Sequence, residues 1–276
     1  MSLRVVTQVI RVAPASGPVP SAVEGRLSYR HRVAQPPSAV RYSIPTMKIA
    51  GIIGGTGPES TIDYYRQIIA VYRERQPDGS YPPMIINSID LTTVVGYMTA
   101  GEHARLADFL VEEIARLARA GAAFALISAN TPHIVFDELR RRSPIPLISI
   151  VEATCRAAQA LGLKKLGLLG TRFTMTAGFY QKVFSEQGIA LALPGEQERA
   201  WVHEIYMGEL VNGIFLPATR ERLLKVIEGM RQRDGIQGMI LGGTELPLIL
   251  RDADCGVSLL DTTRIHVKEI VAAMLA

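Results

Sequence analysis

The chain has 276 residues, of which 48% are hydrophobic and 20% are charged, and its net charge is +4. This composition is ordinary for a globular enzyme, and the length suffices for two small α/β lobes, while no apolar run approaches the roughly 18 residues that span a bilayer. Within residues 1–46, six arginines stand against one acidic residue, so the rest of the chain carries about one negative charge by subtraction. We therefore expect neither a membrane nor a nucleic acid as a partner.

The chain contains two cysteines, Cys155 and Cys255. They are far apart in the sequence and form neither a disulfide framework nor a zinc-binding pattern. We therefore expect a cytoplasmic protein without a bound metal.

Residues 1–46 are rich in Pro, Ser, Val and Arg and show no lasting helical or strand period. Such a composition indicates a disordered segment that does not pack. The arginines and serines are also typical of a transit-like leader, and a functional arm is a third interpretation. Because Met47 directly precedes the first convincing strand, we favour a non-native N-terminal extension and start the fold at residue 47.

Strands and helices alternate through the first half of the chain, as judged from apolar periodicity and from turn residues. The predicted order is strand 48–53, glycine-rich turn 54–61, helix 62–75, strand 84–89, helix 102–120, strand 124–128, helix 134–142, strand 145–150 and a helix through residue 158.

The same order then begins again. The predicted elements are strand and turn 165–171, helix 179–184, strand 188–193, helices 201–212 and 219–234, strand 238–243, strand 257–260 and helix 262–275. Gly167 lies 116 positions after Gly51, and Gly243 lies 114 positions after Ala129, so the offset is almost constant. This pattern predicts an internal duplication and parallel sheets. The expected fold is α/β, with two pseudo-symmetric doubly wound lobes at 47–160 and 161–276 and a cleft between them.

Two strand ends break from apolar residues into small and hydroxyl-bearing ones, at 129–131 and at 243–245. Ligands of open α/β sheets bind at such carboxyl ends. The glycine-rich turn at 54–61 fits neither a dinucleotide fingerprint nor a Walker motif, but it offers the Thr56 hydroxyl and backbone N–H groups to an anion. By this reasoning and by symmetry, the residues expected to contact substrate are Thr56, Asn130, Thr131, Thr171, Thr174 and Thr244.

Four residues at these strand ends are candidates for acid/base work, namely Thr131, His133, Thr244 and Glu245. Each has a plainer interpretation, because short polar residues after a strand often cap the next helix and a lone histidine often packs. Asp261 before the last predicted helix is interpreted first as such a cap, and His266 on that helix as a structural residue.

Five motifs in the same order carry a resemblance to a known family. They are G-I-I-G-G-T-G-P-E-S-T-x-D-Y-Y at 51–65, A-N-T-P-H at 129–133, L-G-T-R-F-T-M at 169–175, L-G-G-T-E-L-P at 241–247 and D-T-T-x-I-H at 261–266. On these motifs the chain resembles the aspartate/glutamate racemase superfamily of cofactor-independent amino-acid racemases. The resemblance implies a two-lobed α/β fold, a homodimer, no cofactor, and a small amino acid or dicarboxylate as substrate.

The family exchanges the substrate α-proton with two thiols, one on each face of the α-carbon. The corresponding positions here are Ala129 and Gly243, which cannot carry a proton, and Cys155 and Cys255 are out of register with them. The expectation is a racemase-like protein whose proton transfer uses other groups. The alternatives are an isomerase or decarboxylase of a small dicarboxylate with the same fold, and a small-acid-binding protein without catalysis.

Overall fold

The computed structural model describes residues 47–251 and 256–276. The interpretation of residues 1–46 and the position of Cys255 therefore lie outside the described residues. Within the described ranges, every helix is too short or too polar to cross a membrane.

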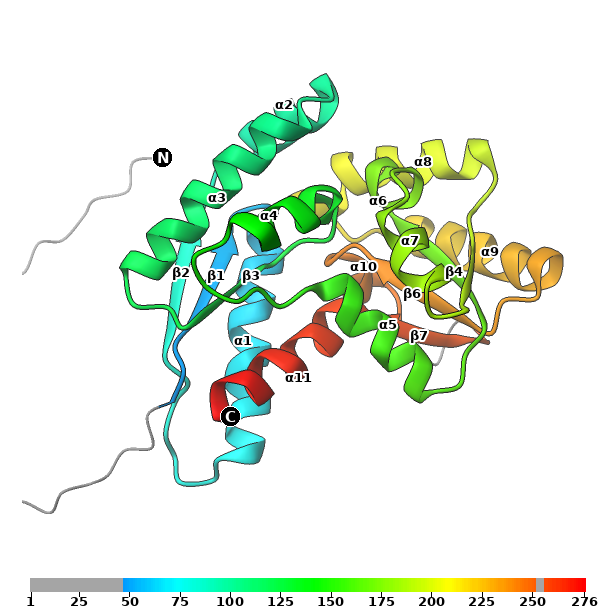
Figure 1. The fold of residues 1–276 in the computed structure, drawn as a ribbon. Coiled ribbons are helices and arrows are strands. Elements are labelled where there is room, and N and C mark those ends of the chain that lie inside the picture. The colour runs from blue at the N-terminus through cyan, green and yellow to red at the C-terminus, as the bar shows by residue number, and fades with distance from the viewer. Residues whose placement is uncertain (1–46, 252–255) are drawn as a thin grey trace, which may run out of the picture. The chain divides into compact units, whose positions relative to one another are not determined.

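The first sheet is parallel and has the strand order β2-β1-β3, with β1 at Ala50–Gly54, β2 at Met84–Ser88 and β3 at Phe124–Ile127 (Figure 1). Successive residues of β1 face opposite sides, so Ile52 packs on one core cluster and Ile53 on another. Apolar residues therefore cover both faces of this sheet, as the continuous hydrophobic strands predict.

The second sheet is also parallel, with the order β5-β4-β6-β7. Its strands are β4 at Lys165–Gly170, β5 at Ala190–Ala192, β6 at Gly238–Gly242 and β7 at Ser258–Asp261. β1, β2 and β3 correspond to β4, β5 and β6 in order and in direction, so the predicted fold of two related parallel-sheet lobes is confirmed.

The strand predicted at 145–150 is reduced to one isolated parallel bridge, between Ala125 and Leu147. This bridge corresponds to the pairing of Met239 with Leu259 in the second sheet. Pro146 has no N–H to donate, and the following helix already begins at Ile150, which leaves no length for a strand.

Helices connect the strands. They are α1 at Pro58–Arg75, α2 at Leu91–Ala100, α3 at His103–Arg119, α4 at Phe136–Arg142, α5 at Ile150–Ala160, α6 at Arg172–Thr176, α7 at Phe179–Ser185, α8 at Glu196–Gly208, α9 at Pro217–Asp234, α10 at Leu246–Ile249 and α11 at Thr262–Leu275, with 3₁₀ turns η1 at Thr131–Val135 and η2 at Leu210–Asn212. α2 is absent from the sequence prediction. It begins because the Asp90 side chain accepts a hydrogen bond from the Thr92 N–H at 2.8 Å, and it ends at Gly101 with φ of 69°.

The two halves exchange their last helices. α5 contributes Ile150, Val151 and Cys155 to the core of the second sheet. α11 instead packs on the first sheet and on α1, and it runs beside α5 (Figure 1). The domain boundary predicted at residue 160 remains a prediction, but each core depends on a helix from the other half.

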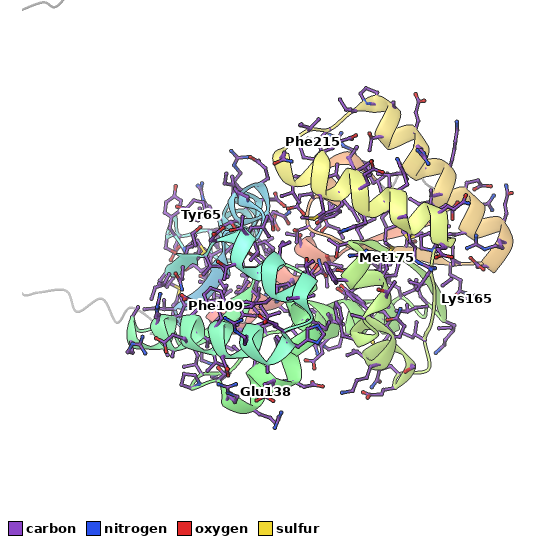
Figure 2. The ribbon with its side chains drawn as sticks, turned by 90° about the horizontal axis from the view of Figure 1, so that it is seen from above. Tyr65, Phe109, Glu138, Lys165, Met175 and Phe215 are labelled. Carbon is purple, nitrogen blue, oxygen red and sulfur yellow. The ribbon has the colours of Figure 1, made fainter. Side chains whose placement is uncertain are left out.

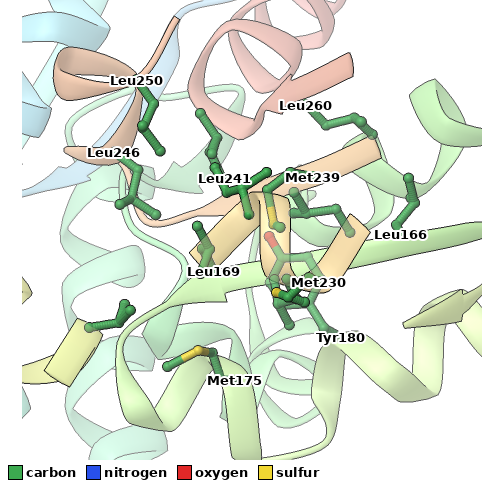
Figure 3. Packing of buried hydrophobic residues seen from close by; sticks show 14 of the residues in the cluster. Leu166, Leu169, Met175, Tyr180, Met230, Met239, Leu241, Leu246, Leu250 and Leu260 are labelled. Atoms are coloured by element: carbon green, nitrogen blue, oxygen red, sulfur yellow. The ribbon is translucent and has the colours of Figure 1, made fainter. Parts of the chain in front are cut away.

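Three clusters of buried side chains form the core of the described residues, two on the faces of the first sheet and one around the second sheet. Seen from above, Phe109 of α3 belongs to the first half and Met175 of α6 to the second (Figure 2). In the cluster of the second half, Leu169 of β4 and Leu241 of β6 belong to one group of buried side chains with Met175 and with Tyr180 of α7 (Figure 3). The strand ends that follow Ile127 and Gly242 are thereby held by rigid packing.

His266 ties α11 to two segments of the first half. Its Nδ1 accepts a hydrogen bond from the Tyr64 hydroxyl at 2.8 Å, and its Nε2 donates to the Ile148 carbonyl at 3.1 Å. Burial lowers the pKa of His266 to about 3, so the ring is neutral at pH 7. His266 is therefore a structural residue.

Candidate active site

A cavity of about 190 Å³ lies at the carboxyl ends of β3 and β6. Its polar part comes from the turn after β1 and from the three strand ends that face it, and comprises Thr56, Asn130, Thr131, Thr171 and Thr244. Ala129 and Gly243 also line it. Five of the six predicted substrate-contacting residues therefore share one cavity.

Three hydroxyl groups form a triangle where the two halves meet. Thr131 Oγ1 lies 3.0 Å from Thr171 Oγ1 and 3.1 Å from Thr174 Oγ1, and the last two are 3.2 Å apart. Thr171 also caps α6 by accepting a hydrogen bond from the Thr174 N–H. Thr131 and Thr171 face the cavity, whereas Thr174 lies behind them. Because a hydroxyl rotates freely, the two front groups can turn their protons toward a bound carboxylate.

Thr56 Oγ1 is buried and has no hydrogen-bond partner in the described structure. Buried polar groups are rarely left unpaired, and one that faces a cavity is available for a ligand oxygen. Thr56 directly precedes α1, whose N-terminus favours negative charge. This corner of the cavity therefore suits an anion.

The side chain of Asn130 already makes two hydrogen bonds within the protein. Its Oδ1 accepts a hydrogen bond from the Tyr180 hydroxyl at 2.5 Å, and its Nδ2 donates to Thr262 Oγ1 at 3.3 Å. The Thr262 hydroxyl in turn donates to the Leu241 carbonyl at 2.8 Å. Asn130 thus fixes one strand end against the other and keeps one amide proton for a ligand.

Tyr206 of α8 fills the space in front of Gly243. A Cβ atom at position 243 would lie 2.4 Å from Tyr206 Cε2 and 2.6 Å from its hydroxyl oxygen. Contacts this short are not tolerated, so only glycine fits beneath the ring. Tyr206 lines the cavity and is 5% exposed. No sequence signal identified it, because nothing in the pattern of α8 reveals which strand end the ring meets.

Glu245 lies directly behind Tyr206 and is 1% exposed. The Tyr206 hydroxyl donates a hydrogen bond to Glu245 Oε2, and Thr244 Oγ1 donates to the same atom at 2.9 Å. Oε1 has no partner. Gly57 approaches this oxygen with φ of 125°, and a Cβ there would lie 2.4 Å from it. Burial raises the pKa of the Glu245 carboxyl and also that of the Tyr206 hydroxyl.

His133, the other predicted acid/base residue, does not line this cavity. Its ring stacks on Phe136 with centroids 4.7 Å apart, and its Nε2 accepts a weak hydrogen bond from the Ile150 N–H at 3.4 Å. Burial lowers the pKa of His133 to about 4, so the ring is neutral at pH 7. It faces a second, polar hollow on the other side of η1.

The remaining wall of the cavity is apolar. α2 supplies Leu91, Val94, Val95 and Met98, and Phe173, Met207 and Val211 continue it. The sequence analysis missed this wall because it did not predict α2. Among the lining residues, Arg172 alone carries a permanent charge, and it is exposed at the rim.

His203 lies beside Arg172 in the lining. Its Nδ1 accepts a hydrogen bond from the Arg172 backbone N–H at 3.3 Å, and burial lowers its pKa. The ring is therefore neutral at pH 7.

The thiol of Cys155 lies in the core of the second half and not at the cavity. Burial raises its pKa, which keeps it protonated. Across the described ranges, histidine, cysteine and acidic side chains form no group of three that is placed to hold a metal ion.

A family model and two solved structures to which this chain is similar all concern Asp/Glu racemases. Residues 53–270 match the model of the family described as Asp/Glu/Hydantoin racemase. The chain is 33% identical to a putative Asp/Glu racemase of Yersinia pestis, whose crystal structure superposes with a TM-score of 0.76 over 83% of this chain and 100% of that one. An aspartate racemase homologue from Pyrococcus horikoshii is 37% identical, with a TM-score of 0.73 and the same coverage.

A curated relative extends the comparison. The broad specificity amino-acid racemase RacX of Bacillus subtilis is 27% identical over 141 residues, which cover 50% of this chain and 61% of RacX. The match therefore spans less than two thirds of that relative. The family model, by contrast, covers both lobes and every strand end that faces the cavity. The chain belongs to the Asp/Glu/hydantoin racemase family.

Proposed function

We propose that this protein binds a small amino acid or a related carboxylate in the cavity and transfers a proton at its α-carbon without a cofactor. The observation that carries the proposal is the convergence of two related strand ends, with hydroxyls from both halves, on one cavity of about 190 Å³. Membership of a racemase family supports the same reaction class.

The hydroxyls account for binding of the substrate carboxylate. Thr56, Thr131 and Thr171 place neutral donors in the lining of the cavity, whereas the Thr244 hydroxyl already donates to Glu245. Removing an α-proton moves negative charge onto the carboxylate oxygens, and donors already fixed in a site of low dielectric stabilise that charge. The N-terminus of α1 next to Thr56 adds to this effect.

The substrate side chain then lies along the apolar wall of α2. This wall favours an uncharged side chain, because a buried carboxylate without a cation is costly. Aspartate and glutamate, the substrates suggested by the family, bring a second carboxylate that Arg172 at the rim is placed to meet. The two classes of ligand are therefore separable by changing Arg172.

Full racemisation needs proton carriers on both faces of the α-carbon. Position 129 offers a methyl group and position 243 a hydrogen atom, so we propose that two-sided exchange by a thiol pair does not occur here. A cytoplasmic location and a homodimer belong to the same proposal. The location rests on the cysteine pattern and the homodimer on the resemblance.

The test is proton NMR of L-aspartate, L-glutamate, L-alanine and L-leucine with the purified protein in deuterated buffer. Loss of the α-proton signal is the expected result, and a variant with Thr131→Val and Thr171→Val together serves as the control for the cavity. A ligand that binds without exchange would indicate a small-acid-binding protein. A ligand that loses carbon dioxide would indicate a decarboxylase.

A further inference from the structure

We propose that Tyr206 and Glu245 form a proton-transfer pair that serves one face of the bound carboxylate at its α-carbon. This inference rests on the proposed function, and it names the group that exchanges the proton.

Apart from the threonine hydroxyls, which are far weaker bases, few side chains of the lining can exchange a proton. They are Arg172, His203 and Tyr206. An arginine does not release its proton in a protein, which leaves the histidine and the tyrosine. Only Tyr206 is connected to a buried carboxyl group, since its hydroxyl donates to Glu245 Oε2. The phenol also stands where a side chain of residue 243 would begin, 2.6 Å from that Cβ position, and so faces the cavity at the end of β6.

The direction of the hydrogen bond defines the chemistry. Because Tyr206 points its proton toward Glu245, its oxygen keeps lone pairs for a proton that comes from the substrate. In the forward step, the Cα–H bond breaks and its proton goes to the Tyr206 oxygen. The Tyr206 hydroxyl proton moves to Glu245 Oε2 at the same time. The electron pair stays on the substrate as an enediolate. The proton now on the Tyr206 oxygen, which lines the cavity, exchanges with solvent deuterium. In the reverse step this deuterium goes to Cα, and Glu245 gives its proton back to Tyr206.

The surroundings of Glu245 fit a group that stores a proton. The side chain is almost fully buried, and Oε1 has no hydrogen-bond partner in the described structure. An ionised carboxylate with an unpaired buried oxygen is unfavourable, so protonation relieves it. Gly57 closes this pocket from below without adding a side chain.

The opposite strand end ends in Ala129, whose methyl group cannot accept a proton. A single pair working from the β6 side removes and returns the α-proton on the same face. The predicted outcome is exchange of the α-proton with solvent while the configuration is retained. This differs from racemisation, which produces the enantiomer.

The experiment follows L-aspartate and L-alanine in deuterated buffer, by proton NMR for exchange and by chiral chromatography for the enantiomer. The variants are Tyr206→Phe, which keeps the ring over Gly243, and Glu245→Gln, which keeps the shape of the side chain. Tyr65→Phe on the exposed face of α1 is the matched control for the loss of a phenol hydroxyl. Binding of each ligand is measured separately by chemical-shift titration.

We expect Tyr206→Phe and Glu245→Gln to lower the exchange rate at least about 100-fold, the usual contribution of a general acid/base. Binding should change by less than about threefold, because the threonine hydroxyls are the groups that hold the substrate carboxylate. The rate in the unaltered protein should rise with pH as the Glu245 carboxyl ionises, and Glu245→Gln should lose this dependence. A purely structural role of Glu245 would leave the pH profile unchanged.

Three results would overturn the pair while leaving the proposed function intact. One is exchange at the original rate in Tyr206→Phe, and another is an enantiomer that forms as fast as deuterium enters. The third is loss of exchange only in His203→Asn. If the unaltered protein binds a ligand but exchanges no proton, both the pair and the proposed proton transfer are wrong. If it binds none of these ligands, the proposed binding function fails as well.

Discussion

The ring of Tyr206 occupies the volume that a side chain at position 243 would need. The two residues come from α8 and from the end of β6, and a Cβ at position 243 would lie within 2.4 Å of the ring. A cysteine at this position is therefore incompatible with the tyrosine. Glycine at position 243 and tyrosine at position 206 therefore depend on each other.

A change at position 243 should reveal this relationship in the stability of the protein. Gly243→Ala is expected to lower the free energy of unfolding by about 1–3 kcal/mol, because the added methyl group overpacks the site. In a Tyr206→Ala background the same change should cost much less, since the ring is gone. Denaturant unfolding of the two single variants and the double variant measures this coupling, and equal costs in both backgrounds would contradict it.

The overlap between the Tyr206 ring and a side chain at position 243 also determines how a pair of cysteines can be introduced at positions 129 and 243. Ala129→Cys with Gly243→Cys is expected to destabilise the protein and to give no two-sided exchange, because Tyr206 blocks residue 243. Adding Tyr206→Ala should relieve the overlap and allow the enantiomer of the substrate to form. Chiral chromatography of product from the double and triple variants distinguishes them, with Ala129→Cys alone as the control.

The burial of Glu245 predicts a pH dependence of stability. Its carboxyl pKa is raised in the folded protein above the ordinary value of 4.5, so the folded state binds the proton more tightly than the unfolded state. This contribution is fully present below pH 4.5 and is lost as the pH rises through the raised pKa. The difference in unfolding free energy between the unaltered protein and Glu245→Gln should therefore shift with pH above 4.5. A constant difference from pH 4.5 to 8 would rule out a raised pKa.

The buried His133 predicts the opposite sign. Its pKa falls from 6.5 to about 4 on folding, because burial disfavours the charged ring. The corresponding stability is present above pH 6.5 and is lost as the pH falls toward 4, at up to about 1.4 kcal/mol per pH unit. His133→Gln should flatten the loss over this range. Unfolding curves at pH 7, 6, 5 and 4 provide the measurement, and parallel losses in both proteins would disprove the assignment.

The hydroxyl triangle predicts unequal roles for its members. Thr131→Val should weaken binding of a carboxylate about tenfold, because a hydrogen bond to a charged group is lost. Thr174→Val should have a smaller effect, since Thr174 lies behind the lining and touches the ligand only through its neighbours. Chemical-shift titration of both variants with the same ligand tests the order. Equal losses would place Thr174 at the ligand.

Arg172 should decide between the two classes of substrate. If a dicarboxylate binds with its second carboxylate at the rim, Arg172→Ala weakens aspartate binding about tenfold and leaves leucine binding nearly unchanged. If the apolar wall of α2 sets the preference, leucine binds more tightly than aspartate in both proteins. Titration of each ligand against each protein separates the two outcomes.

Much of this architecture is predictable from the sequence. The apolar runs at β1, β3, β4 and β6 and their constant offset predict two parallel sheets, and the small residues after Ile127 and Gly242 predict the site. These features are predictable because a buried strand and its end can be recognised from the residues of that segment alone.

Other features depend on distant packing. Residues 91–100 contain β-branched and apolar side chains without a clear helical stripe, so α2 and the apolar wall stay hidden. The sequence does not distinguish Tyr206 from other aromatic residues in helices, because its position over Gly243 at the end of β6 is visible only in the folded structure. The strand predicted at 145–150 fails for a different reason, because Pro146 has no N–H to donate and α5 already begins at Ile150.

The exchange of helices between the halves delays folding of the first lobe while the chain is being synthesised. When β1 and α1 leave the ribosome, the face of the sheet that carries Ala50 and Ile52 can pack only on α1, and its second partner α11 is made last. Lys48 at the start of this region is bonded through its N–H to the Met274 carbonyl at 3.1 Å. The first lobe therefore cannot complete its core while the second is still being translated. Cutting the chain between the halves would yield two fragments that each lack a wall and that need each other to fold.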